Sequence, residues 1–120
     1  MSSPTDELKS MLAPNEQVQL YTKRKFYHSK IVIESVAITN ARIILGHANG
    51  PGLEKGYTDY SYGDIKDVEV KGVLRSTLKV MLKEGETLLL DDMANSDAQE
   101  AYGIIRQNLD KYRASNAAET

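Results

Sequence analysis

The chain has 120 residues, 41% hydrophobic residues and a net charge of −2, which is the size and composition of one soluble domain. It contains no cysteine, so disulfides, thiolate catalysis and cysteine-based zinc or iron–sulfur sites are excluded. Two histidines are too few for a histidine-rich metal site, and the slightly acidic balance creates no overall field that favours nucleic acid.

The first residues predict a short helix rather than a targeting signal. Ser3 is a candidate N-cap, and Pro4 suits the first helical position because its missing N–H needs no partner there. Leu8 and Leu12 follow at helical spacing, so we expect a helix over about 4–12. Acidic residues stand where a signal peptide needs positive charge, and no apolar run approaches the ~20 residues of a transmembrane helix. We therefore expect a cytoplasmic location.

Strand patterns occupy the middle of the chain, from about residue 17 to 91. The segment KIVIESVAIT (30–39) is rich in β-branched residues, and RIILGH (42–47) follows it after a tight turn. A glycine-rich loop covers 48–56, and Glu84-Gly85 is typical of a hairpin turn. The pattern predicts about seven strands. Because most links are short, we expect an antiparallel arrangement.

The end of the chain predicts an amphipathic helix over about 97–113. Ser96 and Gln99 have the spacing of a capping box. One apolar stripe follows, formed by Ala98, Ala101, Tyr102, Ile105, Leu109 and Tyr112. Gly103 costs helix stability, so its presence indicates close packing at that point. We expect residues 114–120 to form a flexible tail.

Three segments carry motifs of a known family: LAPNEQV (12–18), ITNARII (38–44) and YSYGDIKDVE (60–69). They resemble the L-x-P-x-E-x-V, T-N-x-R and Y-x-D-I-x-x-V-E segments of bacterial pleckstrin-homology (PH) domains and the related GRAM domains. Seven strands followed by one helix is also the PH order. The chain lacks the tryptophan that many eukaryotic PH domains carry in the end helix, so it resembles the prokaryotic branch.

The resemblance implies a mainly β fold: a PH-like, seven-stranded antiparallel β-barrel or sandwich, capped by the C-terminal helix and preceded by a short N-terminal helix. We expect a single domain over 1–113. Thr39, Arg42 and Asp64 belong to the motifs, and we interpret them as signatures of the fold rather than as ligand sites. Thr39 suits a turn because its hydroxyl can bond nearby backbone groups. Arg42 is predicted to pair with a carboxylate, for which Asp64 is one candidate.

The sequence offers no catalytic constellation. His28 and His47 are the only histidines, and neither sits in a catalytic motif. We expect neither to lie within reach of a serine or threonine hydroxyl in a closed pocket. The pair Asp91-Asp92 is interpreted as structural, because it stands just before the end helix. No enzyme activity, cofactor or metal site is predicted.

Positive charge is concentrated around the first predicted hairpin. Residues 17–49 hold five Lys/Arg and one acid, a net +4, while the rest holds ten against sixteen, a net −6. The hairpin cations and the nearby histidine are Lys23, Arg24, Lys25, His28 and Lys30. In PH domains the first turn is where basic side chains grip phosphorylated head groups. Two readings are open: an anion or lipid-headgroup site, or a solvated hairpin whose cations balance an acidic body.

The resemblance implies a non-catalytic binding or scaffolding module that mediates protein interaction or self-association, for example through exposed sheet edges. A protein partner or a homo-oligomer is therefore expected. The alternative is recruitment to an anionic membrane or phosphate head groups through the basic hairpin, which would place the cytoplasmic protein peripherally at the membrane. Nucleic acid is not an expected partner, because binding it needs a wider basic face.

Overall fold

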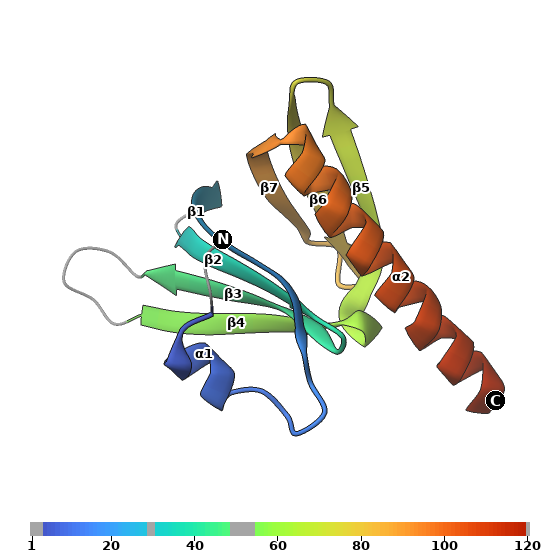
Figure 1. Cartoon of the computed structure of the whole chain (residues 1–120). Helices are drawn as coiled ribbons and strands as arrows, with labels where there is room; N and C mark the ends of the chain where they lie inside the picture. The colour runs from blue at the N-terminus through green and yellow to red at the C-terminus, as the bar shows by residue number, and fades with distance from the viewer. Residues whose placement is uncertain (1–3, 29–30, 49–54, 120) are drawn as a thin grey trace. The chain divides into compact units, whose positions relative to one another are not determined.

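A computed structural model of the chain describes residues 4–28, 31–48 and 55–119 (Figure 1). Side chains are described over 4–23, 32–47 and 56–116. In chain order the elements are α1 (Asp6–Ser10), β1 (Val18–His28), β2 (Ile31–Thr39), β3 (Arg42–Ala48), β4 (Lys55–Ser61), the 3-10 turn η1 (Tyr62–Asp64), β5 (Ile65–Gly72), β6 (Arg75–Leu82), β7 (Thr87–Ala94) and α2 (Asn95–Glu119).

The chain divides into two compact units, Met1–Asp59 and Tyr60–Thr120, where the sequence predicts one domain over 1–113. The strands are antiparallel in both units, in the orders β1-β2-β3-β4 and β5-β6-β7. Seven strands and two terminal helices confirm the predicted fold class. Among the described residues the strands form two sheets and no closed barrel. No helix in the described part of the chain is long and apolar enough to cross a membrane.

In the first unit, the short helix α1 packs on one face of the four-stranded sheet (Figure 1). Leu8 is buried against Ala37 and Ile44, which lie opposite each other on β2 and β3. The predicted start of this helix is wrong by about two residues. Thr5, not Ser3, is the N-cap, because its extended backbone lets its hydroxyl accept a hydrogen bond from Leu8 N–H at 3.2 Å.

The sheet of the first unit is irregular at one level. The β1–β2 register shifts between Lys23 and Phe26, and the β2–β3 register shifts between Ile33 and Ser35. An extra residue at such a bulge interrupts the alternation of side chains and bends the strand. Both irregularities fall at the same level of β2, so the sheet bends there.

In the second unit, α2 packs against β5, β6 and β7 with the predicted apolar stripe. The buried members of the stripe are Ala98, Ala101, Ile105 and Leu109. Tyr112, in contrast, is 37% exposed. The predicted end of the helix at about 113 is wrong, because α2 continues to Glu119. The tail residues are small and polar, but they include good helix formers and no proline, so nothing in them ends the helix.

Gly103 corrects a second expectation about α2. The sequence predicts close packing there, yet apart from the adjacent residues and the backbone of α2 itself no described heavy atom lies within 4 Å of the position that a Cβ on Gly103 would take. The residue is exposed, so packing does not explain why this position is a glycine.

Candidate functional site

The residues of the T-N-x-R motif form an ion-pair cluster in the first unit. The Arg42 guanidinium donates from Nε to Glu16 Oε2 at 2.9 Å and from Nη1 to Asp59 Oδ2 at 3.0 Å. Thr39 accepts from the Arg42 backbone N–H at 2.9 Å and donates its hydroxyl to Glu16 Oε2 at 2.7 Å. The cluster thus ties the segment before β1 to the β2–β3 turn.

Arg42 pairs with carboxylates, as predicted, but the described partners are Glu16 and Asp59 rather than the candidate Asp64. Glu16 takes the role because the turn before β1 brings it beside the β2–β3 turn, where Asn40 Oδ1 also accepts from Gln17 N–H at 2.8 Å. Asp64 instead accepts a hydrogen bond from Ser61 Oγ at 3.1 Å across η1.

Glu16 carries the strongest electrostatic effect of the cluster. Burial raises its pKa, but hydrogen bonds from Arg42, from Thr39 and from the Ala13 N–H outweigh burial and lower the pKa from 4.5 to about 2. The carboxylate is therefore charged at neutral pH and fully engaged. Such a cluster holds the fold together and leaves little capacity for a ligand.

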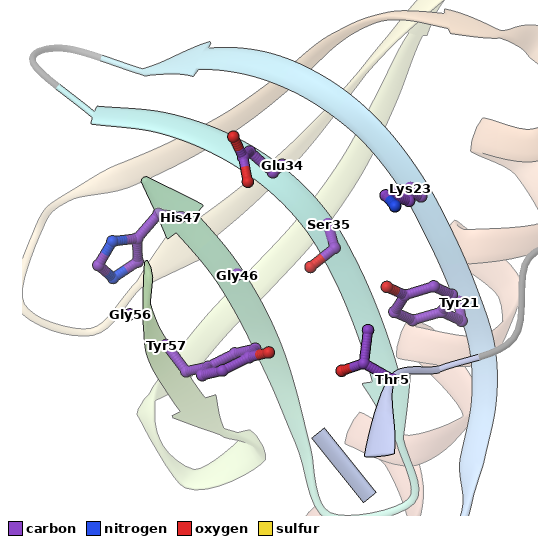
Figure 2. Close-up of a pocket in the computed structure, with 9 residues that line it drawn as sticks. All are labelled: Thr5, Tyr21, Lys23, Glu34, Ser35, Gly46, His47, Gly56 and Tyr57. Atoms are coloured by element: carbon purple, nitrogen blue, oxygen red, sulfur yellow. The ribbon is translucent and has the colours of Figure 1, made fainter. Parts of the chain in front are cut away.

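A polar hollow lies on the same face of the sheet as α1 (Figure 2). One row of neighbours crosses three strands at its base: Lys23 on β1 lies opposite Ser35 on β2, which lies opposite Gly46 on β3. The hollow has a volume of about 70 Å³. Its lining residues are Thr5, Tyr21, Lys23, Glu34, Ser35, Gly46, His47, Gly56 and Tyr57.

The bulge in β2 shapes this lining. In a regular strand Glu34 and Ser35 would point to opposite faces. Because the register shifts between Ile33 and Ser35, both residues contribute to the hollow. Figure 2 shows Glu34 to one side of Ser35 and Lys23 to the other.

Gly46 forms the floor of the hollow. A Cβ on this residue would lie 2.3 Å from Ser35 Oγ and 3.4 Å from Tyr57 Cε1. No side chain fits there unless Ser35 moves. Glycine therefore allows the Ser35 hydroxyl to occupy the space that a side chain at position 46 would need.

Two tyrosines give the walls of the hollow an apolar base and a polar rim. The rings of Tyr21 and Tyr57 pack against the core of Leu8, Ala37 and Ile44. Their hydroxyl groups, with those of Ser35 and Thr5, turn toward the middle of the hollow (Figure 2). Rings anchored in a core hold their hydroxyls in defined positions.

The second unit carries an apolar surface at the tip of the β5–β6 hairpin, formed by Val73 and Leu74. The two side chains are 85% and 86% exposed. Gly72 begins the turn with φ +129, and a Cβ on it would lie 2.2 Å from the Arg75 carbonyl oxygen. The turn that projects Val73 and Leu74 therefore requires glycine.

A family model described as "Bacterial PH domain" matches residues 12–107. The chain belongs to the bacterial PH domain family. The match confirms the family that the three sequence motifs indicate, and PH domains are as a class binding or scaffolding modules. No curated protein matches the chain.

The structure of this PH domain describes one side chain of the predicted anion site. Lys23 is exposed on β1 and lines the hollow. The other predicted members have side chains that lie outside the described residues: Arg24, Lys25, His28 and Lys30. Recruitment to anionic membranes or phosphate head groups through these five residues stays a prediction.

His47 lies within reach of a threonine hydroxyl, but at an open hollow and not in the closed pocket that the prediction concerns. Its Nε2 lies 3.0 Å from Thr58 Oγ1 on the neighbouring strand β4, and the residue also lines the hollow. A cross-strand hydrogen bond between β3 and β4 accounts for the contact. His28 lies outside the described side chains.

Sequence reasoning missed both surfaces of this PH domain. The hollow depends on a bulge, and a bulge leaves only a faint break in the alternation of KIVIESVAIT. The hairpin tip had a clearer signal: two aliphatic residues directly follow a glycine and stand between Lys71 and Arg75. A turn flanked by cations does not need aliphatic residues for folding.

Proposed function

We propose that this bacterial PH domain is a non-catalytic module that binds protein, either a partner or a second copy of itself, through the tip of the β5–β6 hairpin. The observation that carries the proposal is the exposure of Val73 and Leu74, at 85% and 86%. Single exposed aliphatic residues are common on protein surfaces, but two adjacent ones at a projecting turn are a typical binding anchor.

The tip offers a useful amount of binding free energy. Burying one such side chain contributes about 1.5–3 kcal/mol, so both together contribute about 3–6 kcal/mol. A contribution of this size is that of an interface hot spot. It needs surrounding contacts from the partner to give a stable complex, because association has its own entropic cost.

Charges around the tip favour a protein over an anionic membrane as the binding surface. The nearby ionisable residues are of both signs in equal number: Lys71, Arg75 and Lys79 against Glu69, Asp91 and Asp92. Arg75 is also engaged with the Asp92 carboxylate at 2.9 Å. Anionic bilayers attract clusters of several unopposed cations. The tip has no such cluster among the described residues.

Two of the four outer strands, β1 and β7, are less suitable surfaces for self-association. The outer strand β1 carries the run Lys23-Arg24-Lys25 next to its register shift. The outer strand β7 has a register irregularity against β6 and a left-handed residue, Asp92, with φ 53. Charges and bulges on outer strands are the features that prevent edge-to-edge pairing. The hairpin tip carries neither.

Two measurements test the proposal. The first is molar mass by light scattering as concentration increases, for wild type and for the double variant V73S/L74S. The second is crosslinking in the native host from a photoreactive residue at position 74, compared with one at the exposed position 84. We expect either self-association that V73S/L74S abolishes, or a crosslinked protein that appears from position 74 and is lost when Val73→Ser is added.

The control variant is Leu89→Ser, which removes a 40% exposed leucine from the middle of β7 and should change neither result. Thermal melts verify that each variant folds. A monomer at all concentrations, together with equal crosslinking from positions 74 and 84, would contradict the proposal.

A further inference from the structure

The hollow of the first unit contains one charge of each sign. Lys23 and Glu34 both line it, from neighbouring strands β1 and β2. No ion pair between described side chains joins either of them to another residue. Figure 2 shows the two on opposite sides of Ser35. Two opposite charges that line one hollow, with no ion pair between described side chains, are suited to a ligand that carries both complementary charges.

Hydroxyl groups line the hollow on both sides of Ser35: Tyr21 on the side of Lys23, and Tyr57 on the side of β4 (Figure 2). Tyr21, Ser35 and Tyr57 each present an oxygen that can donate to an anionic group. Hydroxyl donors beside an ammonium group form the charge-assisted hydrogen bonds that carboxylates accept. The lining therefore offers several hydrogen-bond donors to an anionic group, and one carboxylate, that of Glu34, to a cationic group.

Size restricts the ligand further. A cavity of about 150 Å³ holds benzene, so the hollow, at about 70 Å³, admits only a few heavy atoms. A nucleotide or an inositol phosphate is too large. A simple anion would meet the Glu34 carboxylate, and a simple cation would meet the Lys23 ammonium, so neither matches the charges.

We propose that the hollow binds a small amino-acid zwitterion, such as glycine or alanine. Its carboxylate accepts from Lys23 and the neighbouring hydroxyls, and its ammonium donates to Glu34. Glycine at position 46 allows the Ser35 hydroxyl to lie directly over the β3 backbone, since a Cβ there would come within 2.3 Å of Ser35 Oγ. This inference involves the first unit only and is independent of the hairpin-tip proposal.

The test uses glycine as the probe, with acetate and methylamine as probes that each carry half of its charge. Binding is followed through backbone amide chemical shifts, at ligand concentrations up to tens of millimolar. We expect saturable changes with glycine, centred on the residues around Ser35 and Gly46, and much weaker changes with either half. Lys23→Met and Glu34→Gln should each reduce glycine affinity roughly tenfold or more, because each removes a charged hydrogen-bond partner.

Matched control variants are Lys83→Met and Glu84→Gln, which remove an exposed charge of each sign from the β6–β7 hairpin and should leave affinity unchanged. Tyr57→Phe keeps the ring in the core and should weaken binding by a smaller factor. No saturable change with glycine overturns the proposal. Equal binding of acetate and glycine overturns it too, because the site would then recognise only an anion. An effect of the control variants equal to that of Lys23→Met has the same consequence.

Discussion

Glu16 is the residue whose protonation controls stability most directly. Its pKa is lowered from 4.5 to about 2 in the folded chain, so folding favours the charged form. This stabilisation is present above pH 4.5 and is lost as the pH falls through about 2. One pKa unit corresponds to about 1.36 kcal/mol, so the contribution at neutral pH is about 3 kcal/mol. We expect Glu16→Gln to lower the free energy of unfolding by an amount of that order at pH 7.

Denaturant titrations between pH 7 and pH 2 measure this effect. The Glu16→Gln variant should lose less stability on acidification than the wild type does, because the group that titrates has been removed. Glu100→Gln, which changes an exposed carboxylate on α2, should follow the wild-type curve. Parallel pH curves for Glu16→Gln and wild type would contradict the role given to Glu16.

Gly103 and Gly85 predict opposite effects of the same substitution. Gly103 lies inside α2 with open space at its Cβ position, so Gly103→Ala should stabilise the chain by up to about 1 kcal/mol. Gly85 has φ +100, which an alanine adopts only with strain, so Gly85→Ala should destabilise it. The melting temperatures of both variants, compared with that of the wild type, test these two expectations. A lower melting temperature for Gly103→Ala would mean that this position does have a neighbour.

At the scale of the elements, α2 holds the second unit together through one stripe. Leu109 is 1% exposed and lies in the last buried turn of the helix. Leu109→Ala should destabilise the chain by about 2–5 kcal/mol, since the residual cavity adds to the lost transfer free energy. Exposed Tyr112 gives the comparison: Tyr112→Ala removes a larger side chain and should cost less. Equal costs in denaturant unfolding would mean that the end of α2 packs differently.

Elements with regular periodicity were predictable from the sequence, and elements defined by local irregularity were not. The stripe of Ala101, Ile105 and Leu109 is a pure helical repeat, and the motifs indicate the family. The extension of α2 beyond 113 follows from the absence of a stop signal, which a polar composition hides. The partner of Arg42 depends on how a turn folds back, and the hollow depends on the bulge at Glu34. Neither leaves a periodic signal in the sequence.

At the scale of the whole molecule, the distribution of charge predicts whether the chain binds anionic membranes. The net charge is −2, and the charges around the apolar tip are of both signs in equal number. At physiological ionic strength exposed charges are screened beyond about 8 Å, so the cations of the first hairpin act only at close range. We therefore expect the chain to remain in the supernatant when acidic liposomes are sedimented.

The liposome experiment also separates the two functional hypotheses. Sedimentation with acidic liposomes that disappears when Lys23, Arg24 and Lys25 are reversed to glutamate would favour membrane recruitment through the basic hairpin. Sedimentation that disappears in V73S/L74S would favour insertion of the tip instead. No sedimentation of any variant at low salt agrees with a protein-binding module.

The turn at Gly72 separates the shape of the hairpin from the chemistry of its tip. The glycine backbone alone makes the turn, with φ +129 and the Arg75 carbonyl where a Cβ would be. Val73 and Leu74 contribute almost nothing to the core, since more than four-fifths of each side chain is exposed. Substitutions at these two positions therefore carry little penalty for folding. Partner choice can diverge here by point mutation while the scaffold stays unchanged, which makes positions 73 and 74 the natural place to engineer a new specificity.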